Sequence, residues 1–368
     1  MSIEYKIQNA QPKDATGLAS LAQRGFKGYP FESVYDPISL AGNIAKGEIR
    51  IIALLQPDLQ RIIGTAVLGV DGLMAEIKRV IVDPDYRKNG LAKDMTIHLA
   101  QEAEKRHAHP YTDTRADQIG MQRSSLGAGL KAVSIETGKH VVFDHRDGDD
   151  KPVGPARESM VHMTSLEIPS ESLYEGLRKW PPLLAEKLIE NMEKAQHNPE
   201  EKNREVATTR LPSAQKVREK IYGMLSEAQN GFQVLYDEQD VTIISHGNIK
   251  MTIIKPDASG FLETNELTSK EDLEYVLRLS EAIGLQIVTG YENVHDGKRV
   301  LLMSEDSLIP AMVRPWQVSE KKAPEWQVGF RKTMNDYDQC LHHIRLDETV
   351  RRQLEEFVTN LRANVLNN

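Results

Sequence analysis

The chain has 368 residues, of which 40% are hydrophobic and 27% charged, so it can build the cores of about two domains. Its 46 Lys and Arg residues against 54 Asp and Glu residues give a formal net charge of −8, which argues against a general nucleic-acid binder. The single cysteine, Cys340, excludes a disulfide within the chain and a zinc site built from several thiolates. No apolar run has the length of a membrane span or of a signal peptide, so we expect a cytoplasmic protein without a membrane partner.

The first 168 residues predict a unit in which helices and strands are mixed. The pair Asp71-Gly72 separates two apolar runs, which is a strong signal for an antiparallel hairpin. Apolar side chains recur at helical spacing from Leu91 to Ala103 and predict a helix. The expected strands are 3–8, 48–55, 61–70, 73–82, 111–114, 133–135, 140–143 and 159–168, and the expected helices are 12–25, 39–46, 91–106 and 117–126.

The character of the sequence changes after residue 168. Residues 171–229 are typical of helices with a polar break at 197–203, and alternating strand patterns return from Gly231. The later part predicts strands at 232–236, 241–245, 250–254, 285–289 and 299–303, and helices at 270–283 and 348–365. We therefore expect an N-terminal domain at 1–168, a helical connection at 169–230 and a smaller α+β domain at 231–368. Its strand–helix–strand order could echo the first domain, but no matching loop motif is present.

The segment from Glu76 to Ala92 is the most informative part of the sequence. An apolar strand runs into an Asp-Pro turn and then into a loop that contains Gly90 and opens a helix. The start of a helix offers unpaired N–H groups and a partial positive charge, and glycine lets a ligand approach the backbone closely. Arg87 and Lys88 add positive charge beside this loop. The segment therefore predicts a site for a pyrophosphate group.

The spacing Arg87-x-x-Gly90-x-Ala92 after an apolar strand resembles the R/Q-x-x-G-x-G/A signature of the GNAT superfamily of acyl-CoA-dependent N-acyltransferases. The order of the expected elements before this motif, and the stretch 121–131 after it, are also similar to that family. The resemblance covers about residues 1–168, and the remainder of the chain is not recognised. It implies a GNAT-like α+β fold with a mixed, mostly antiparallel sheet flanked by helices.

The resemblance also implies where a co-substrate binds. Acetyl-CoA or another acyl-CoA is the expected co-substrate, and no metal is expected. The backbone of Ile81 and Val82 is expected to hold the pantetheine arm beside the strand, which splays there from strand 111–114. The expected pyrophosphate ligands are the backbone N–H groups of Arg87, Lys88, Asn89, Gly90, Leu91 and Ala92.

Two residues are the candidates for acid–base chemistry. Glu76 lies eleven positions before Arg87, where related acetyltransferases carry a general-base glutamate; the plain alternative is a solvent-facing strand residue. An ammonium must lose a proton before it attacks a thioester, so a carboxylate is the chemistry that this step needs. Many family members protonate the leaving thiolate with a tyrosine of the fourth helix, but this chain has Ser124 and Ser125 there. Ser125 or a water molecule is expected to replace that tyrosine.

Together with these residues, the resemblance implies an N-acyltransferase that moves an acetyl or other acyl group from acyl-CoA to a primary amine by direct attack in a ternary complex. The expected acceptor is a small molecule or a peptide. The alternative is an acyl-CoA-binding regulatory or scaffold protein without catalysis, whose C-terminal domain binds a partner, and self-association as a homodimer is left open. A metal site at His107, His109 and Asp113 is the weaker interpretation, because histidines suit the end of a helix.

Overall fold

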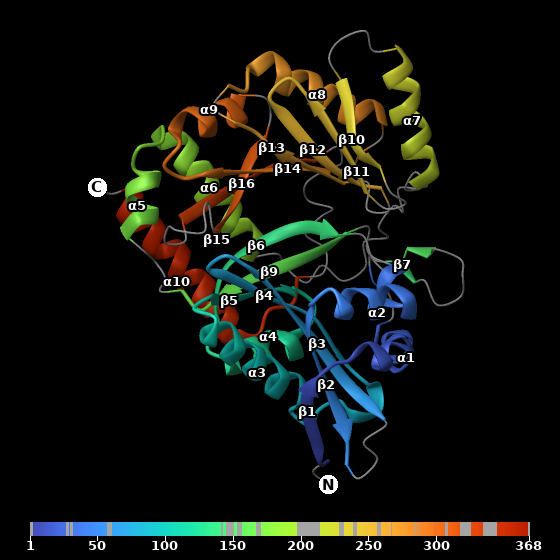
Figure 1. Cartoon of the computed structure of the whole chain (residues 1–368). Coiled ribbons are helices and arrows are strands. Elements are labelled where there is room, and N and C mark those ends of the chain that lie inside the picture. The colour runs from blue at the N-terminus through green and yellow to red at the C-terminus, as the bar shows by residue number, and fades with distance from the viewer. Residues whose placement is uncertain are drawn as a thin grey trace.

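The chain forms two sheet-containing units in the computed structural model, and one lies above the other (Figure 1). The structure describes residues 3–26, 29, 32–56, 61–140, 143–144, 151–152, 157–166, 171–196, 214–227, 232–237, 241–255, 259–265, 267–283, 285, 287–305, 308–316, 325–333 and 344–366. Cys340 and the polar break expected at 197–203 lie outside these ranges. No helix in the described ranges is both long and apolar enough to cross a lipid bilayer.

The N-terminal unit is built on a seven-stranded sheet with the order β1-β2-β3-β4-β5-β9-β6. All neighbouring strands are antiparallel except β4 and β5, which run parallel. Its strands are β1 (Tyr5–Asn9), β2 (Ile49–Leu55), β3 (Ile62–Asp71), β4 (Met74–Val82), β5 (His109–Arg115), β6 (Lys131–His140) and β9 (Glu158–Thr164). Its α-helices are α1 (Ala15–Gly25), α2 (Pro37–Ala45), α3 (Leu91–Lys105) and α4 (Ile119–Gly127). Short 3-10 turns lie at Pro12–Asp14, Glu32–Val34 and Pro84–Tyr86, and β7 (Phe143–Asp144) pairs with β8 (Lys151–Pro152).

Helices cover both faces of this sheet, and the alternation along β2 shows why. Ile51 and Ala53 pack in one core with Leu91 and Met95 of α3. Ile52 lies between them in sequence and packs in the other core, with α1. Successive side chains of a strand point to opposite faces, so a strand covered on both sides becomes continuously apolar.

The second unit repeats the strand order of the first. Its sheet has the order β10-β11-β12-β13-β14-β16-β15, antiparallel except for the parallel pair β13–β14. The strands are β10 (Phe232–Asp237), β11 (Val241–His246), β12 (Ile249–Ile254), β13 (Ser259–Glu263), β14 (Ile287–Asn293), β15 (Ile309–Trp316) and β16 (Glu325–Thr333). Helix α8 (Lys270–Ile283) connects the parallel pair, as α3 does in the first unit, and α9 (Gly297–Glu305) follows. The suspected echo is therefore a repeat of topology.

These sheets confirm the predicted mixed, mostly antiparallel α+β fold with a second sheet-rich unit. One expected element is wrong, because residues 299–303 belong to helix α9 and not to a strand. Val300 and Met303 are buried three positions apart, which is helical spacing, but a short apolar run does not separate the two structures by pattern. The domain boundaries at 168 and 230 stay predictions.

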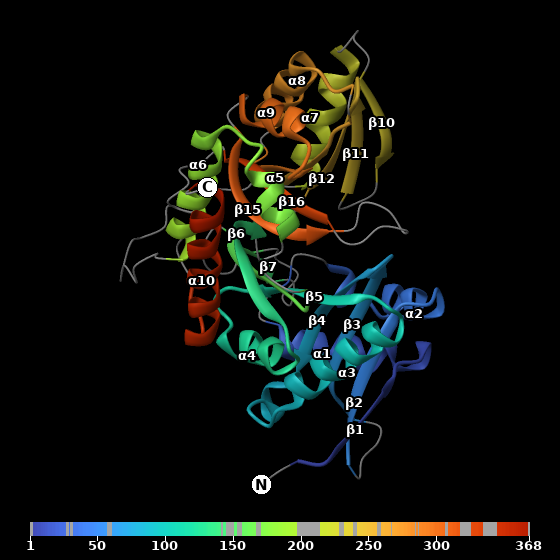
Figure 2. The ribbon, with the colours of Figure 1, turned by 90° about the vertical axis from the view of Figure 1, so that its left-hand side faces the viewer.

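Three helices lie along the side of the two units. They are α5 (Glu171–Leu177), α6 (Pro182–Gln196) and α10 (Glu348–Val365), and α7 (Ala214–Glu227) lies apart from them, against α8. Figure 2 shows α10 running beside α6 along both units. The approach to α10 is fixed on the N-terminal unit, since the side chain of Gln122 bonds to the backbone of Arg345 and of Asp347. The C-terminal helix therefore ties the two units together.

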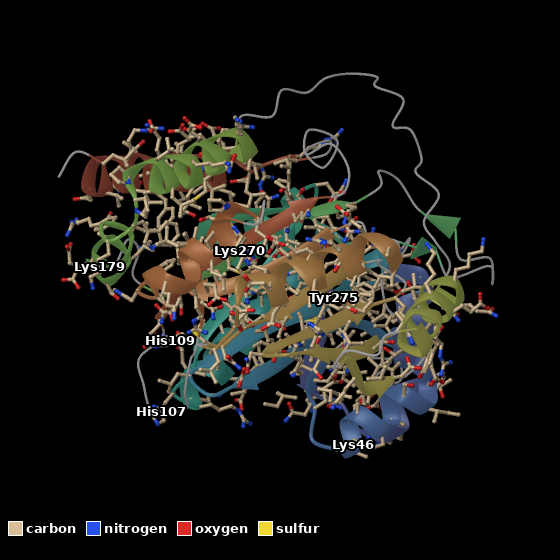
Figure 3. The ribbon with its side chains drawn as sticks, turned by 90° about the horizontal axis from the view of Figure 1, so that it is seen from above. Lys46, His107, His109, Lys179, Lys270 and Tyr275 are labelled. Carbon is tan, nitrogen blue, oxygen red and sulfur yellow. The ribbon has the colours of Figure 1, made fainter. Side chains whose placement is uncertain are left out.

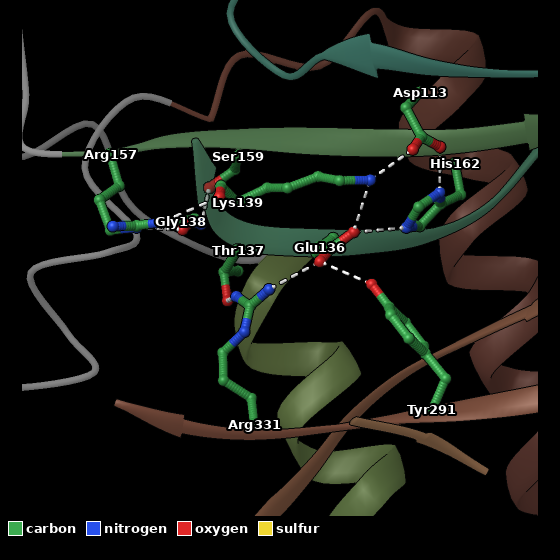
Figure 4. A network of polar contacts seen from close by, with 10 residues as sticks. All are labelled: Asp113, Glu136, Thr137, Gly138, Lys139, Arg157, Ser159, His162, Tyr291 and Arg331. Carbon is green, nitrogen blue, oxygen red and sulfur yellow. Dashed lines mark hydrogen bonds and ion pairs between the residues drawn. The ribbon is translucent and has the colours of Figure 1, made fainter. Parts of the chain in front are cut away.

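A buried group of charged side chains lies where the two sheets meet (Figure 4). One oxygen of the Glu136 carboxylate accepts hydrogen bonds from Tyr291 at 2.9 Å and from Arg331 at 3.0 Å, both in the second unit. Its other oxygen faces Lys139 at 3.0 Å and His162 at 3.2 Å. Burial alone raises the pKa of Glu136, but Lys139, His162 and Arg331 outweigh it and hold that pKa well below its usual range. The carboxylate is therefore charged and is neutralised partly by the other unit.

Replacing this carboxylate is expected to destabilise the whole chain. Glu136→Gln leaves Lys139 and Arg331 buried with one negative charge fewer, which typically costs about 3 kcal/mol or more. Urea unfolding measures the free energy, and Glu193→Gln is the control, because its ion pair with Arg362 is about 40% exposed. The control is expected to lose less than about 1 kcal/mol. Equal losses in the two variants would contradict the role given to the buried group.

Candidate active site

A cavity of about 750 Å³ opens between the end of β4, the start of α3 and the start of α4. Strands β4 and β5 pair only from Met74 to Glu76, opposite His109 to Tyr111, and beyond this point they part. The parting confirms the expected splay and leaves the second half of β4 open on one side. The residues that line the cavity are Gly25, Phe26, Val80, Ile81, Val82, Tyr86, Arg87, Lys88, Gly90, Leu91, Ala92, Lys93, Arg115, Asp117, Gln118, Gly120, Met121, Ser124 and Glu158.

The loop before α3 has the backbone geometry of an anion site. Gly90 is the residue that caps the helix, and its φ of 82° is a left-handed conformation that glycine adopts without strain. The first intrahelical bond joins the N–H of Asp94 to the carbonyl of Gly90 at 3.0 Å, so the N–H groups just before Asp94 have no acceptor within the helix. The Asn89 side chain donates to the carbonyls of Tyr86 at 3.2 Å and Arg87 at 3.1 Å and so holds the loop in shape.

Arg87 has a positioning role that its charge alone did not predict. Its guanidinium donates to the carbonyl of Gly25 at 2.6 Å and to that of Val82 at 3.3 Å. A side chain at Gly25 would lie 2.3 Å from Ile81, so glycine is needed for α1 to end this close to β4. Arg87 therefore holds the end of α1 against the strand that borders the cavity.

A bulge interrupts β4 beside the cavity. Thr65 pairs with Ile81 and Val67 with Lys78, so two residues of β4 lie opposite one residue of β3. Arg79 has a φ of 52°, and its side chain pairs with Glu48 at 3.3 Å. A bulge redirects backbone groups away from the neighbouring strand. Val80 then lines the cavity, in the region where sequence reasoning expected a backbone donor for an oxyanion.

Seven of the eight expected co-substrate residues line this one cavity, and the eighth, Asn89, shapes its loop. The two expected catalytic residues lie elsewhere. Glu76 is at the paired start of β4, where its carboxylate contacts Lys78 at 2.7 Å. Ser125 is fully buried in α4, and its hydroxyl donates to the carbonyl of Met121 at 3.0 Å. Neither is among the residues that line the cavity, and their catalytic roles stay predictions.

The cavity brings in a pair of charged residues that sequence reasoning missed. Glu158 opens β9, and its carboxylate meets the guanidinium of Arg115 at 2.9 Å. Only 15% of the Glu158 side chain is exposed. Burial raises the pKa of Glu158 to about 7. Arg115 lowers this pKa, and Asp117 raises it, but burial has the largest effect. No local motif announces Glu158, since the residues that surround it come from distant parts of the sequence.

The structure separates the weaker candidate metal site into two places. His107 and His109 lie near one another, at the point where β5 begins (Figure 3). Asp113 instead joins Glu136 and His162, the only group of three metal-ligating residues among the described ones. The ammonium of Lys139 contacts both carboxylates of that group. A cation from the chain itself therefore occupies the place between them, and the expected absence of a metal stays a prediction.

Comparison with known proteins gives a family for part of the chain. Residues 19–124 match the acetyltransferase (GNAT) family. No curated protein matches the sequence significantly. Among solved structures, the ribosomal-protein-S18-alanine N-acetyltransferase from Escherichia coli is 19% identical, with a TM-score of 0.35, over 46% of this chain and 97% of that one.

Two further structures give similar values. A phosphinothricin acetyltransferase from Sinorhizobium meliloti in complex with acetyl-CoA is 12% identical, with a TM-score of 0.36, over 43% of this chain and 86% of that one. An N-acetyltransferase from Thermoplasma acidophilum in complex with coenzyme A is 13% identical, with a TM-score of 0.34, over 45% and 100%. The family match covers β4, α3, β5 and most of α4, and it ends before β9, whose first residue Glu158 also lines the cavity. Within the N-terminal unit, residues 19–124 thus match a GNAT acetyltransferase domain.

Proposed function

We propose that this protein is an N-acyltransferase that moves an acetyl group from acetyl-CoA to a primary amine by direct attack in a ternary complex. The observation that carries the proposal is that one cavity joins the helix start at Gly90 to the open, bulged half of β4. These are the two parts that a long anionic thioester needs: a site for its phosphates and an unpaired strand edge for its amide-bearing arm.

The co-substrate would lie along the cavity with its pyrophosphate on the N–H groups from Arg87 to Ala92. Lys88 and Lys93 also line the cavity and would add positive charge at this end. The pantetheine arm would pair with the backbone of Ile81 and Val82, as an added strand in the space that β5 leaves. The thioester would then reach the bulge at Val80, where a backbone N–H group would stabilise the oxyanion.

The reaction needs a base for the amine and tolerates a weak acid for the thiolate. A thiolate is a fair leaving group, so the missing tyrosine of the fourth helix does not prevent transfer. Met121 and Ser124 line the cavity on α4, and Ser125 follows behind them. A water molecule between Ser124 and the sulfur would serve as the proton source, and the role predicted for Ser125 stays an alternative. The family match does not favour the other expectation, a non-catalytic acyl-CoA-binding scaffold.

The proposal predicts that acetyl-CoA and CoA bind at the loop of Gly90. A tryptophan at this position would fill the cavity beside the helix start, so Gly90→Trp is expected to weaken binding at least ~100-fold, or about 2.7 kcal/mol. Calorimetric titration with both ligands measures it. Gly129→Trp is the matched control, because Gly129 has a φ of 83° and equally open surroundings but lies outside the cavity lining.

The control variant is expected to bind as the wild type does, which separates loss of the site from backbone strain. Acetyl transfer is then measured by mass spectrometry with acetyl-CoA and three primary amines: ethanolamine, spermidine and a tetrapeptide with N-terminal alanine. Acetylation of at least one amine supports the proposal. Binding of neither CoA ligand to folded wild-type protein would overturn it.

A further inference from the structure

We propose that Glu158 is the catalytic base that removes the proton from the acceptor amine. This inference rests on the proposed acyl transfer and names the residue that does its acid–base step. The cavity lining holds two carboxylates among the described residues, those of Asp117 and Glu158. Both lie on the wall formed by the end of β5 and the start of β9, which is the wall opposite to the backbone of β4 across the splay.

The fold places Glu158 there through backbone pairing. The N–H of Ala116 donates to the carbonyl of Ser159 at 2.8 Å, and Arg115 is opposite Met160 in the antiparallel pair of β5 and β9. These bonds fix the first residue of β9 beside the last residue of β5, at the mouth of the splay. A thioester on the β4 backbone would therefore lie between Val80 on one side and the Glu158 carboxylate on the other.

The charged surroundings of Glu158 suit a base that works near neutral pH. Arg115 on β5 holds the carboxylate at 2.9 Å, Asp117 follows on the same wall, and His140 on β6 is its cross-strand partner. The Arg115 guanidinium lies 6.0 Å from the ring of Phe26, another cavity residue. Burial raises the pKa of Glu158 to about 7, so the carboxylate is a stronger base than an exposed one and is still partly ionised at neutral pH.

Glu76 has the less suitable position for this step. It belongs to the paired part of β4, before the strands separate, and Lys78 holds its carboxylate at 2.7 Å. The distance along the sequence from the loop motif is the feature that pointed to Glu76. The arrangement in space points to Glu158, because this carboxylate shares a cavity with the loop and with the bulge.

The proposed step balances without any other reactant. The Glu158 carboxylate takes one proton from the acceptor ammonium, directly or through a water molecule. The neutral amine then forms the C–N bond and the C–S bond breaks. The second nitrogen proton goes to the departing sulfur through the water molecule beside Ser124. The products are the amide, the CoA thiol and protonated Glu158, which returns its proton to solvent.

Removal of the base is tested with Glu158→Gln and acetyl-CoA, using whichever of ethanolamine, spermidine and the alanine tetrapeptide the wild type acetylates fastest. We expect kcat at pH 7 to fall about 10²-fold or more, because general bases contribute this much, with the KM for acetyl-CoA unchanged. The wild-type pH profile is expected to show an acidic limb near pH 7 in addition to the ionisation of the amine. The variant is expected to keep only the amine limb.

Three companion variants make the result specific. Glu158→Asp keeps a carboxylate and is expected to keep the acidic limb and recover part of the rate. Glu292→Gln is the matched control, because Glu292 is also a buried glutamate paired with an arginine, Arg299 at 3.4 Å, but lies in the second unit. This variant is expected to leave kcat and the acidic limb unchanged. If Glu76→Gln loses the limb and Glu158→Gln keeps it, the inference is wrong and the transfer reaction stands. If the wild type acetylates none of the three amines, both proposals are wrong.

Thermal unfolding gives a second test that needs no acceptor. A glutamate whose pKa is raised on folding favours the protonated native state, so its stabilising effect is complete below about pH 4.5 and is lost as pH rises through about 7. Glutamine imitates the protonated form, so the Tm of Glu158→Gln relative to wild type is expected to rise between pH 5 and pH 8. If the difference in Tm between Glu158→Gln and wild type is constant over this range, Glu158 does not titrate there as a buried carboxyl, and the inference is wrong.

Discussion

The parting of β4 from β5 is the constraint on which the rest of the N-terminal unit depends. Both strands begin as a normal parallel pair, but the pairing stops after Glu76. An unpaired strand edge inside a protein carries backbone donors and acceptors that need partners. The bulge at Arg79 turns part of this edge, and the Arg87 side chain satisfies the carbonyl of Val82. What remains open is a strip of backbone beside a helix start, which suits a ligand with amides at one end and phosphates at the other.

The second unit shows that the strand order alone does not create such a site. Its parallel strands, β13 and β14, stay paired over four of the five residues of β13, from Ser259 to Leu262. Its connecting helix is closed at the start, because Ser269 and Asp272 cap one another. Glu271 and Asp272 also place negative charge in the first turn, where an anion would have to bind. Over its described residues, the second unit therefore repeats the strand order of the first without the separated parallel strands and the open helix start.

How much the sequence could predict depended on how local each feature is. The loop motif spans six residues whose spacing directly sets the geometry of a helix start, so the open helix start at Gly90 was predictable. The helices at 270–283 and 348–365 were predictable because each has one apolar face. The helix at Gly297–Glu305 was not, because its short apolar segment fits a strand as well. Glu158 lies 71 positions after Arg87, and only the pairing of β5 with β9 brings it to the cavity.

The buried charges between the units explain how the second sheet contributes to the first. Tyr291 and Arg331 bind a carboxylate on β6, and β6 pairs with β9, the strand that carries Glu158 at its start. Buried ion pairs add little net stability, but an unpaired partner is costly, so they disfavour any displaced arrangement of the two sheets. His162 on β9 belongs to the same group, because it contacts Asp113 and Glu136. Burial lowers the pKa of His162, but these two carboxylates outweigh burial and raise it. The second unit thus fixes the position of the strand that carries the proposed base.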